Sequence, residues 1–143
     1  MTATAGYSGT PLAKKLGIKP DHRFGLLQAP DGFAIPDLPK GVFARVQARG
    51  PLDVVLSFHT ERIDLEQRLP ALMRALRVDG GLWIAWPKRA SGVDTDITED
   101  VIREVALPTG LVDNKVCAVD DTWSGLRLVL RKELRAGRTT AGG

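Results

Sequence analysis

The chain has 143 residues, enough for one domain that buries about two thirds of the surface exposed by its unfolded form, and its 43% hydrophobic and 26% charged residues are typical of a globular protein. No apolar run approaches the roughly 20 residues that span a bilayer, and residues 1–9 lack the features of a secretory signal, so we expect a cytoplasmic protein. A single cysteine excludes an internal disulfide, and two histidines and a net charge of +3 favour neither a metal centre nor a nucleic-acid surface.

The chain begins with a segment of small residues, 1–9, which we expect to be flexible. A short helix is then predicted over residues 10–17. Thr10 would cap it, Pro11 would occupy its first position and Gly17 would end it.

Three strands are predicted in the next part of the chain. The first covers residues 23–29, and the proline-rich segment 30–40 that follows it is predicted to be a loop or an irregular crossover. Residues 42–48 alternate apolar and polar side chains and predict a second strand. Residues 53–58 are apolar enough for a strand that is covered on both faces of its sheet.

From Thr60 the apolar residues recur at the spacing of an amphipathic helix. The apolar stripe consists of Leu65, Leu69, Leu72, Met73 and Leu76. Asp64 with Gln67 would cap this helix, and residues 79–81 would end it. Pro70 removes an internal hydrogen bond, so we expect either a kink there or a helix that restarts with Pro70 in its first turn.

A fourth strand is predicted over residues 82–86, followed by a polar loop over 87–96. Asp96 and Glu99 have the spacing of a capping pair for a second helix, which would end near residue 108 or 110.

The last two strands, residues 111–119 and 126–132, are joined by a turn-rich segment and predict an antiparallel hairpin. Residues 10–132 would therefore form one domain, followed by a flexible basic tail, 133–143. This order of elements predicts an α/β fold with a mostly parallel six-stranded sheet and a C-terminal antiparallel hairpin.

Ligands of open α/β sheets bind at the carboxyl ends of the strands. Three segments are expected to meet there: residues 30–33, 57–60 and 86–96. The candidate ligand-binding residues are Asp31, Gly32, Ser57, His59, Trp86, Lys88, Arg89, Ser91, Gly92, Asp94 and Asp96.

The loop after the fourth strand is the best candidate site. Lys88, Arg89, Ser91 and the backbone at Gly92 would bind an anion beside a helix start. The alternative is a solvated loop whose own carboxylates neutralise the two bases.

His59 directly follows a strand, where a general base or a polar anchor could lie; the alternative is a capping or surface histidine. Trp83 and Trp86, three apart on one strand, should face opposite sides of the sheet. Cys117 lies in an apolar run and is expected to be buried and unreactive.

Residues 52–132 resemble the second half of the Rossmann-like methyltransferases that use S-adenosylmethionine. The resemblance implies a shortened methyltransferase-like fold. The first half departs from that family, because residues 28–32 have one glycine where the family has a glycine-rich loop, and residues 47–50 lack the acid that would bind the ribose. The first crossover is also too short for a full helix.

Three segments also resemble a family of small bacterial proteins catalogued as a domain of unknown function. They are residues 7–18, 86–100 and 110–126, beginning Tyr-Ser-Gly-Thr, Trp-Pro-Lys-Arg and Gly-Leu-Val-Asp. This resemblance implies a bacterial origin and a single domain, and it carries no activity.

The first hypothesis is a non-catalytic binding or interaction module on a degenerate methyltransferase-like scaffold, with no cofactor. Its partner would be a protein or a small anionic ligand, a second copy could cover an open sheet edge, and no membrane partner is expected. The alternative is a small S-adenosylmethionine-dependent methyltransferase with a divergent cofactor site. A weaker alternative is nucleic-acid binding through the basic ends of the chain.

Overall fold

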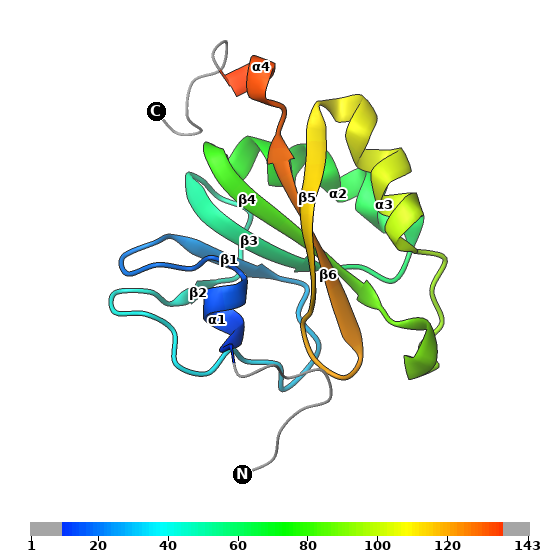
Figure 1. Ribbon diagram of the computed structural model, residues 1–143, viewed down its shortest axis with the longest axis horizontal. Coiled ribbons are helices and arrows are strands. Elements are labelled where there is room, and N and C mark those ends of the chain that lie inside the picture. The colour runs from blue at the N-terminus through cyan, green and yellow to red at the C-terminus, as the bar shows by residue number, and fades with distance from the viewer. Residues whose placement is uncertain (1–9, 136–143) are drawn as a thin grey trace.

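The computed structural model describes residues 10–135, and within this range six strands form one sheet in the order β2-β1-β3-β4-β6-β5 (Figure 1). The strands are β1 (Phe24–Leu27), β2 (Ala44–Arg45), β3 (Leu52–Phe58), β4 (Leu76–Pro87), β5 (Leu111–Ala118) and β6 (Trp123–Leu130). The helices are α1 (Leu12–Lys15), α2 (Arg62–Ala75), α3 (Glu99–Ala106) and α4 (Lys132–Arg135), with 3-10 turns η1 (Arg89–Ser91) and η2 (Leu107–Thr109).

Strands β2, β1, β3 and β4 are parallel, and β6 is antiparallel to both β4 and β5. The predicted α/β class, the mostly parallel sheet and the C-terminal hairpin are therefore confirmed. The predicted flexible ends, 1–9 and 133–143, lie outside the described residues, except that 133–135 belong to α4. No helix in the described part of the chain combines the length and the apolarity needed to cross a membrane.

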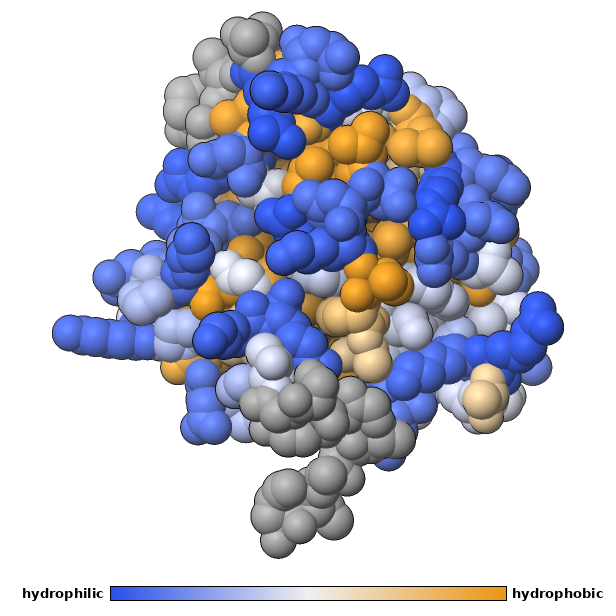
Figure 2. Space-filling view, viewed as in Figure 1, coloured by the Kyte–Doolittle hydropathy of each residue, from blue (hydrophilic) through white to orange (hydrophobic). Residues whose placement is uncertain are grey.

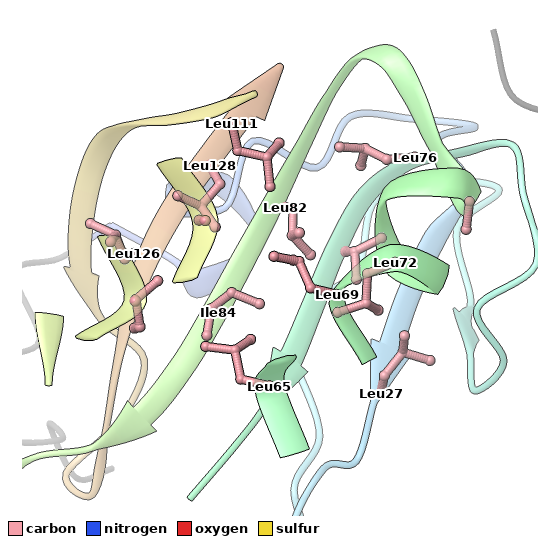
Figure 3. Packing of buried hydrophobic residues seen from close by; sticks show 14 of the residues in the cluster. Leu27, Leu65, Leu69, Leu72, Leu76, Leu82, Ile84, Leu111, Leu126 and Leu128 are labelled. Carbon is pink, nitrogen blue, oxygen red and sulfur yellow. The ribbon is translucent and has the colours of Figure 1, made fainter. Parts of the chain in front are cut away.

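Each face of the sheet has its own apolar cluster. Helices α2 and α3 cover one face, where Leu65, Leu69 and Leu72 of α2 pack against strand residues such as Leu82 and Ile84 (Figure 3). Because β3 lies between β1 and β4 and contributes residues to both clusters, it is buried on both faces, as predicted.

The other face is covered by α1 and by the connection between β1 and β2. No helix forms in this connection, as its three prolines predict; instead Phe33, Ile35 and Leu38 pack against the sheet. Strand β2 has only two residues, fewer than the predicted 42–48, and Phe43 and Val46 on either side of it are exposed.

The tryptophans of β4 face opposite sides of the sheet, as predicted. Trp83 belongs to the cluster under α1, where its indole N–H donates to the carbonyl of Leu16 at 3.0 Å, and Trp86 belongs to the cluster under α2. Trp123, in the hairpin, packs edge-on against Phe58 with 4.9 Å between ring centroids.

The predicted helix stop at residues 79–81 is wrong. Helix α2 ends at Ala75, and residues 79–81 lie within β4. A Cβ atom at Gly80 would lie 2.9 Å from the carbonyl oxygen of Asp53, so this glycine allows two strands to approach closely. Helix α2 also continues through Pro70 and does not restart there.

Two predicted helix caps are also wrong. Pro11 occupies the cap position of α1 and makes no side-chain bond, whereas Gly17 ends the helix with φ +81°, as predicted. Asp64 does not cap α2, whose N-cap is Glu61; Asp64 instead lies in the first turn and binds side chains described below.

Candidate functional site

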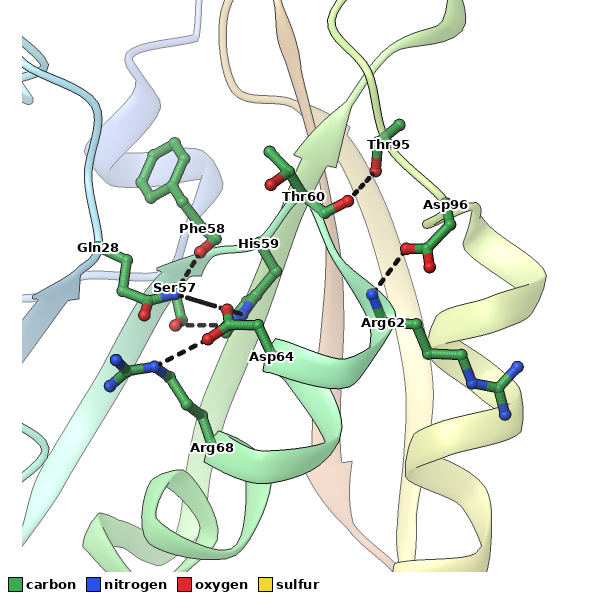
Figure 4. A network of polar contacts seen from close by, with 10 residues as sticks. All are labelled: Gln28, Ser57, Phe58, His59, Thr60, Arg62, Asp64, Arg68, Thr95 and Asp96. Carbon is green, nitrogen blue, oxygen red and sulfur yellow. Dashed lines mark hydrogen bonds and ion pairs between the residues drawn. The ribbon is translucent and has the colours of Figure 1, made fainter.

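The carboxyl ends of β1, β3 and β4 lie at one edge of the sheet, and the polar residues that follow them meet there (Figure 4). The chain leaves β1 through Gln28, which has φ +57°, a left-handed conformation that is uncommon for a residue other than glycine. The Gln28 amide donates to the carbonyl of Phe58 at 2.8 Å and to the carboxylate of Asp64 at 3.0 Å. Its side chain therefore joins the end of β1 to the end of β3 and the start of α2.

Ser57 and His59 form the buried part of this network. Residues two apart on an extended chain lie on the same face, and here the Ser57 hydroxyl is 2.8 Å from Nε2 of His59. Nδ1 of the same ring lies 2.6 Å from the carboxylate of Asp64. Arg68, one turn further along α2, donates to the other carboxylate oxygen at 3.0 Å.

The protonation of the network follows from these contacts. Burial lowers the pKa of His59, which favours a neutral ring. Burial alone would raise the pKa of Asp64, but hydrogen bonds from Gln28, His59 and Arg68 lower it below its usual value. An ionised carboxylate only accepts, so the His59 proton lies on Nδ1 and the Ser57 hydroxyl donates to Nε2. Because the Gln28 amide nitrogen is also a donor, its 3.4 Å contact with Nδ1 is not a hydrogen bond.

Ser57, His59 and Asp64 thus have the connectivity of a hydroxyl, a base and an orienting acid. Ser57, however, lies within a strand and is 1% exposed, and His59 is 2% exposed. We therefore interpret the three residues as a buried network that fixes the end of β3 against α2, in which Nε2 of His59 accepts a hydrogen bond from the Ser57 hydroxyl.

A cavity of about 310 Å³ lies beside this network, between the ends of β1 and β2 and helix α2. Its polar wall is formed by Gln28, Gln47, Ser57 and Arg68, and its apolar wall includes Leu72. This volume is at the lower end of the range for small-molecule sites.

The loop before α3 is fixed to the start of α2. The Thr95 hydroxyl donates to the carbonyl of Thr60 at 2.6 Å, and the carboxylate of Asp96 accepts from the amide of Arg62 at 2.6 Å (Figure 4). The predicted capping pair of Asp96 with Glu99 is therefore wrong. Thr98 caps α3, and its hydroxyl accepts from the amide three residues on.

Two polar side chains of the predicted anion-binding loop are bonded to backbone carbonyls of the protein. The Lys88 ammonium donates to the carbonyl of Asp120 at 2.7 Å, and the Ser91 hydroxyl donates to the carbonyl of Lys88 at 2.6 Å. Gly92, with φ +76°, ends η1, and Trp86 is buried in the core. Arg89, Asp94, Asp31 and Gly32 are exposed.

Of the predicted site residues, only Ser57 and His59 contact each other through their side chains in a shared network. Its other members, Gln28, Asp64 and Arg68, were not predicted. The i, i+2 spacing of Ser57 and His59 and an acid in the first turn of the next helix were the available signals. That the remaining candidates bind a ligand stays a prediction.

The described residues favour neither a metal site nor a reactive thiol. No group of three or more histidine, cysteine, aspartate or glutamate side chains within residues 10–135 could hold a metal ion. Burial raises the pKa of Cys117, which favours the unreactive thiol over the thiolate.

The fold is similar to that of solved methyltransferases, as the sequence resemblance implied. An S-adenosylmethionine-dependent methyltransferase from Aquifex aeolicus gives a TM-score of 0.58 at 13% identity, over 82% of this chain and 86% of that chain. TrmN from Thermus thermophilus gives 0.59 at 12% identity, over 83% of this chain and 47% of that one, so this chain spans less than half of TrmN. The fibrillarin pre-rRNA processing protein of Methanococcus jannaschii gives 0.54 at 13% identity, over 80% and 68%. At such identities the likeness establishes the fold alone.

Residues 41–132, more than half of the chain, match the model of a family described as "Protein of unknown function (DUF3052)". The matched range contains Ser57, His59 and Asp64 and begins after Gln28. No curated protein matches the sequence.

Proposed function

Because the chain belongs to the DUF3052 family and has a methyltransferase-like fold, we propose that it is a binding module that keeps this scaffold without a working cofactor site. The main support is the position of Gln28. In the family that the fold resembles, a glycine-rich loop after the first strand allows the backbone to approach the cofactor. Here the Gln28 side chain lies at that point and is bonded to Phe58 and Asp64.

Two further features support the proposal. The short strand β2 is followed by Val46, Gln47 and Ala48, which offer no carboxylate to ribose hydroxyls. The connection between β1 and β2 has no helix, and its Phe33 packs edge-on against Phe58 at the carboxyl end of β3, with 4.9 Å between centroids. The residues present therefore do not fit S-adenosylmethionine.

The cavity beside the network is the proposed ligand site. Its mixed wall, with Gln28, Gln47 and Arg68 on one side and Leu72 on the other, suits a small polar molecule with an anionic or carbonyl group. The loop over residues 86–96 is a second proposed contact, at the same edge of the sheet.

The first experiment is a calorimetric titration of the full chain with S-adenosylmethionine and S-adenosylhomocysteine, with thermal unfolding as a second readout. We expect neither heat of binding nor a shift in melting temperature. A bound ligand at 100 times its dissociation constant would stabilise the fold by about 2.7 kcal/mol, which thermal unfolding would detect. Saturable binding of one cofactor per chain would contradict the proposal and support the alternative, a small methyltransferase.

The ligand site itself is tested by a fragment screen observed by NMR. Fragments that shift the resonances of Gln28, Gln47 and Arg68 should lose binding in Ala71→Trp, which fills the cavity from α2. Ala34→Trp, at an exposed position of the connection between β1 and β2 that does not line the cavity, is the matched control and should leave binding unchanged. Fragments that bind both variants equally would place the site elsewhere.

A further inference from the structure

A second cavity, of about 380 Å³, lies at the opposite edge of the sheet, near the amino ends of β3 and β4. Basic residues from three elements line it. They are Lys14 and Lys15 of α1, Lys19 just after it, Lys115 of β5 and Arg127 of β6. Figure 2 shows this face of the molecule, with hydrophilic side chains over α1 and along the neighbouring strands.

The positive charge of this basic cavity is not balanced by the carboxylates that line it. Of these, Asp53 is already occupied, because it pairs with Arg77 at 3.0 Å and accepts from the amide of Arg23 at 2.8 Å. Asp79 is the other. Within residues 10–135 no ion pair joins any of the five cations to a carboxylate.

Arg127 is the central residue of the basic cavity. It pairs directly with Lys115 across the antiparallel strands, and like charges at such positions are destabilising. Partial burial and the nearby Arg135 lower the pKa of Arg127. Its guanidinium lies against β4, where a Cβ atom at Gly81 would be 2.6 Å from Nε.

These observations describe a half-buried guanidinium that lies among lysines and forms no ion pair with a carboxylate of residues 10–135. A guanidinium presents paired donors that match the oxygens of a phosphate, and lysines add point charges around them. The volume is that of a small-molecule site, and no phenylalanine, tyrosine or tryptophan of residues 10–135 lines the basic cavity to stack on a base. Both features favour a small phosphorylated molecule over single-stranded nucleic acid.

We propose that the basic cavity binds the phosphate group of a small phosphorylated ligand, with Arg127 as the main contact and Lys115 and the lysines of the α1 segment around it. The site is independent of the cavity beside His59, because the two lie at opposite edges of the sheet. It therefore stands whether or not the chain binds S-adenosylmethionine.

The test is a calorimetric titration of the full chain with inorganic phosphate at low salt, together with its effect on thermal unfolding. We expect saturable binding that weakens about tenfold or more in Arg127→Met, since one charge-assisted contact is lost. Arg74→Met makes the same change on an exposed residue of α2, on the other face of the sheet, and should change the affinity less than about twofold.

Arg127→Met is expected to fold, because it removes one member of an unneutralised pair of like charges, and its melting temperature should no longer rise with phosphate. Lys115→Met provides a second variant with the same expected direction. The proposal is overturned if wild-type protein fails to bind millimolar phosphate, or if Arg74→Met weakens binding as much as Arg127→Met does. It is also overturned if a single-stranded oligonucleotide binds with a steep salt dependence and inorganic phosphate does not compete.

Discussion

The carboxylate of Asp64 accepts hydrogen bonds from His59, Gln28 and Arg68, so Asp64→Ala should destabilise the fold. The His59 side chain is 0% exposed, and the loss of an acceptor for a buried N–H costs about 1–3 kcal/mol. The Arg68 side chain is 57% exposed, so its ion pair adds at most about 1 kcal/mol. Gln28 keeps its bond to Phe58. We expect a total loss of about 2–3 kcal/mol in the free energy of unfolding.

The assay is urea unfolding followed by the fluorescence of the buried tryptophans. Asp100→Ala is the matched control, because Asp100 also lies in the first turn of a helix and also pairs with an arginine, Arg103, at 3.0 Å. Its side chain is 85% exposed, so the loss should stay within about 0.5 kcal/mol. Both variants lose a first-turn carboxylate, so the difference between them reports mainly the loss of an acceptor for the buried donors. Equal losses in the two variants would refute this account of the network.

Three other predictions concern stability. Burial lowers the pKa of His59 in the folded protein, so as the pH falls the unfolded chain binds a proton at this histidine before the folded chain does. The free energy of unfolding should therefore be highest above the ordinary pKa of 6.5 and should fall as the pH drops below it. His59→Gln should flatten this fall in urea titrations; a variant that keeps the full pH dependence of the wild type would contradict the assignment. Asp96→Ala removes the acceptor for the first amide of α2 and should cost about 1 kcal/mol, measured by thermal unfolding. Gly50→Ala would place a Cβ atom closer to the Ala75 carbonyl oxygen than van der Waals contact allows. This clash should lower the free energy of unfolding by about 1–3 kcal/mol in the same assay, and an unchanged melting temperature would disprove it.

The strands and the hairpin could be predicted because their residues carry a local pattern. The apolar run of β3, the turn before β6 and the prolines of residues 30–40 act on neighbouring residues, and the structure confirms each. The bounds of β6 differ from the prediction, because it covers Trp123–Leu130 and not 126–132. The end of α2 could not be predicted in this way. Gly80 and Gly81 look like a helix stop in the sequence, but their role is set by Asp53 and Arg127, which belong to other strands.

The site was predicted less completely than the fold. The strand end at His59 was identified correctly, yet the histidine's environment depends on Gln28, 31 residues earlier, and on the way α2 folds back. The alternative of a surface histidine is wrong, because His59 is 2% exposed. Asp64 was assigned to a cap because sequence spacing does not reveal which side chain a first-turn acid will face.

The residue at the N-cap position of helix α2 does not cap the helix with its side chain. Glu61 makes no side-chain capping bond, and the acceptor for the amide of Arg62 is Asp96, which lies 34 residues later and beyond β4. The first turn of α2 is therefore complete only after β4 has paired and the following loop has docked. Amide exchange at Arg62 should accordingly report the opening of that loop, and the two segments should exchange as one cooperative unit.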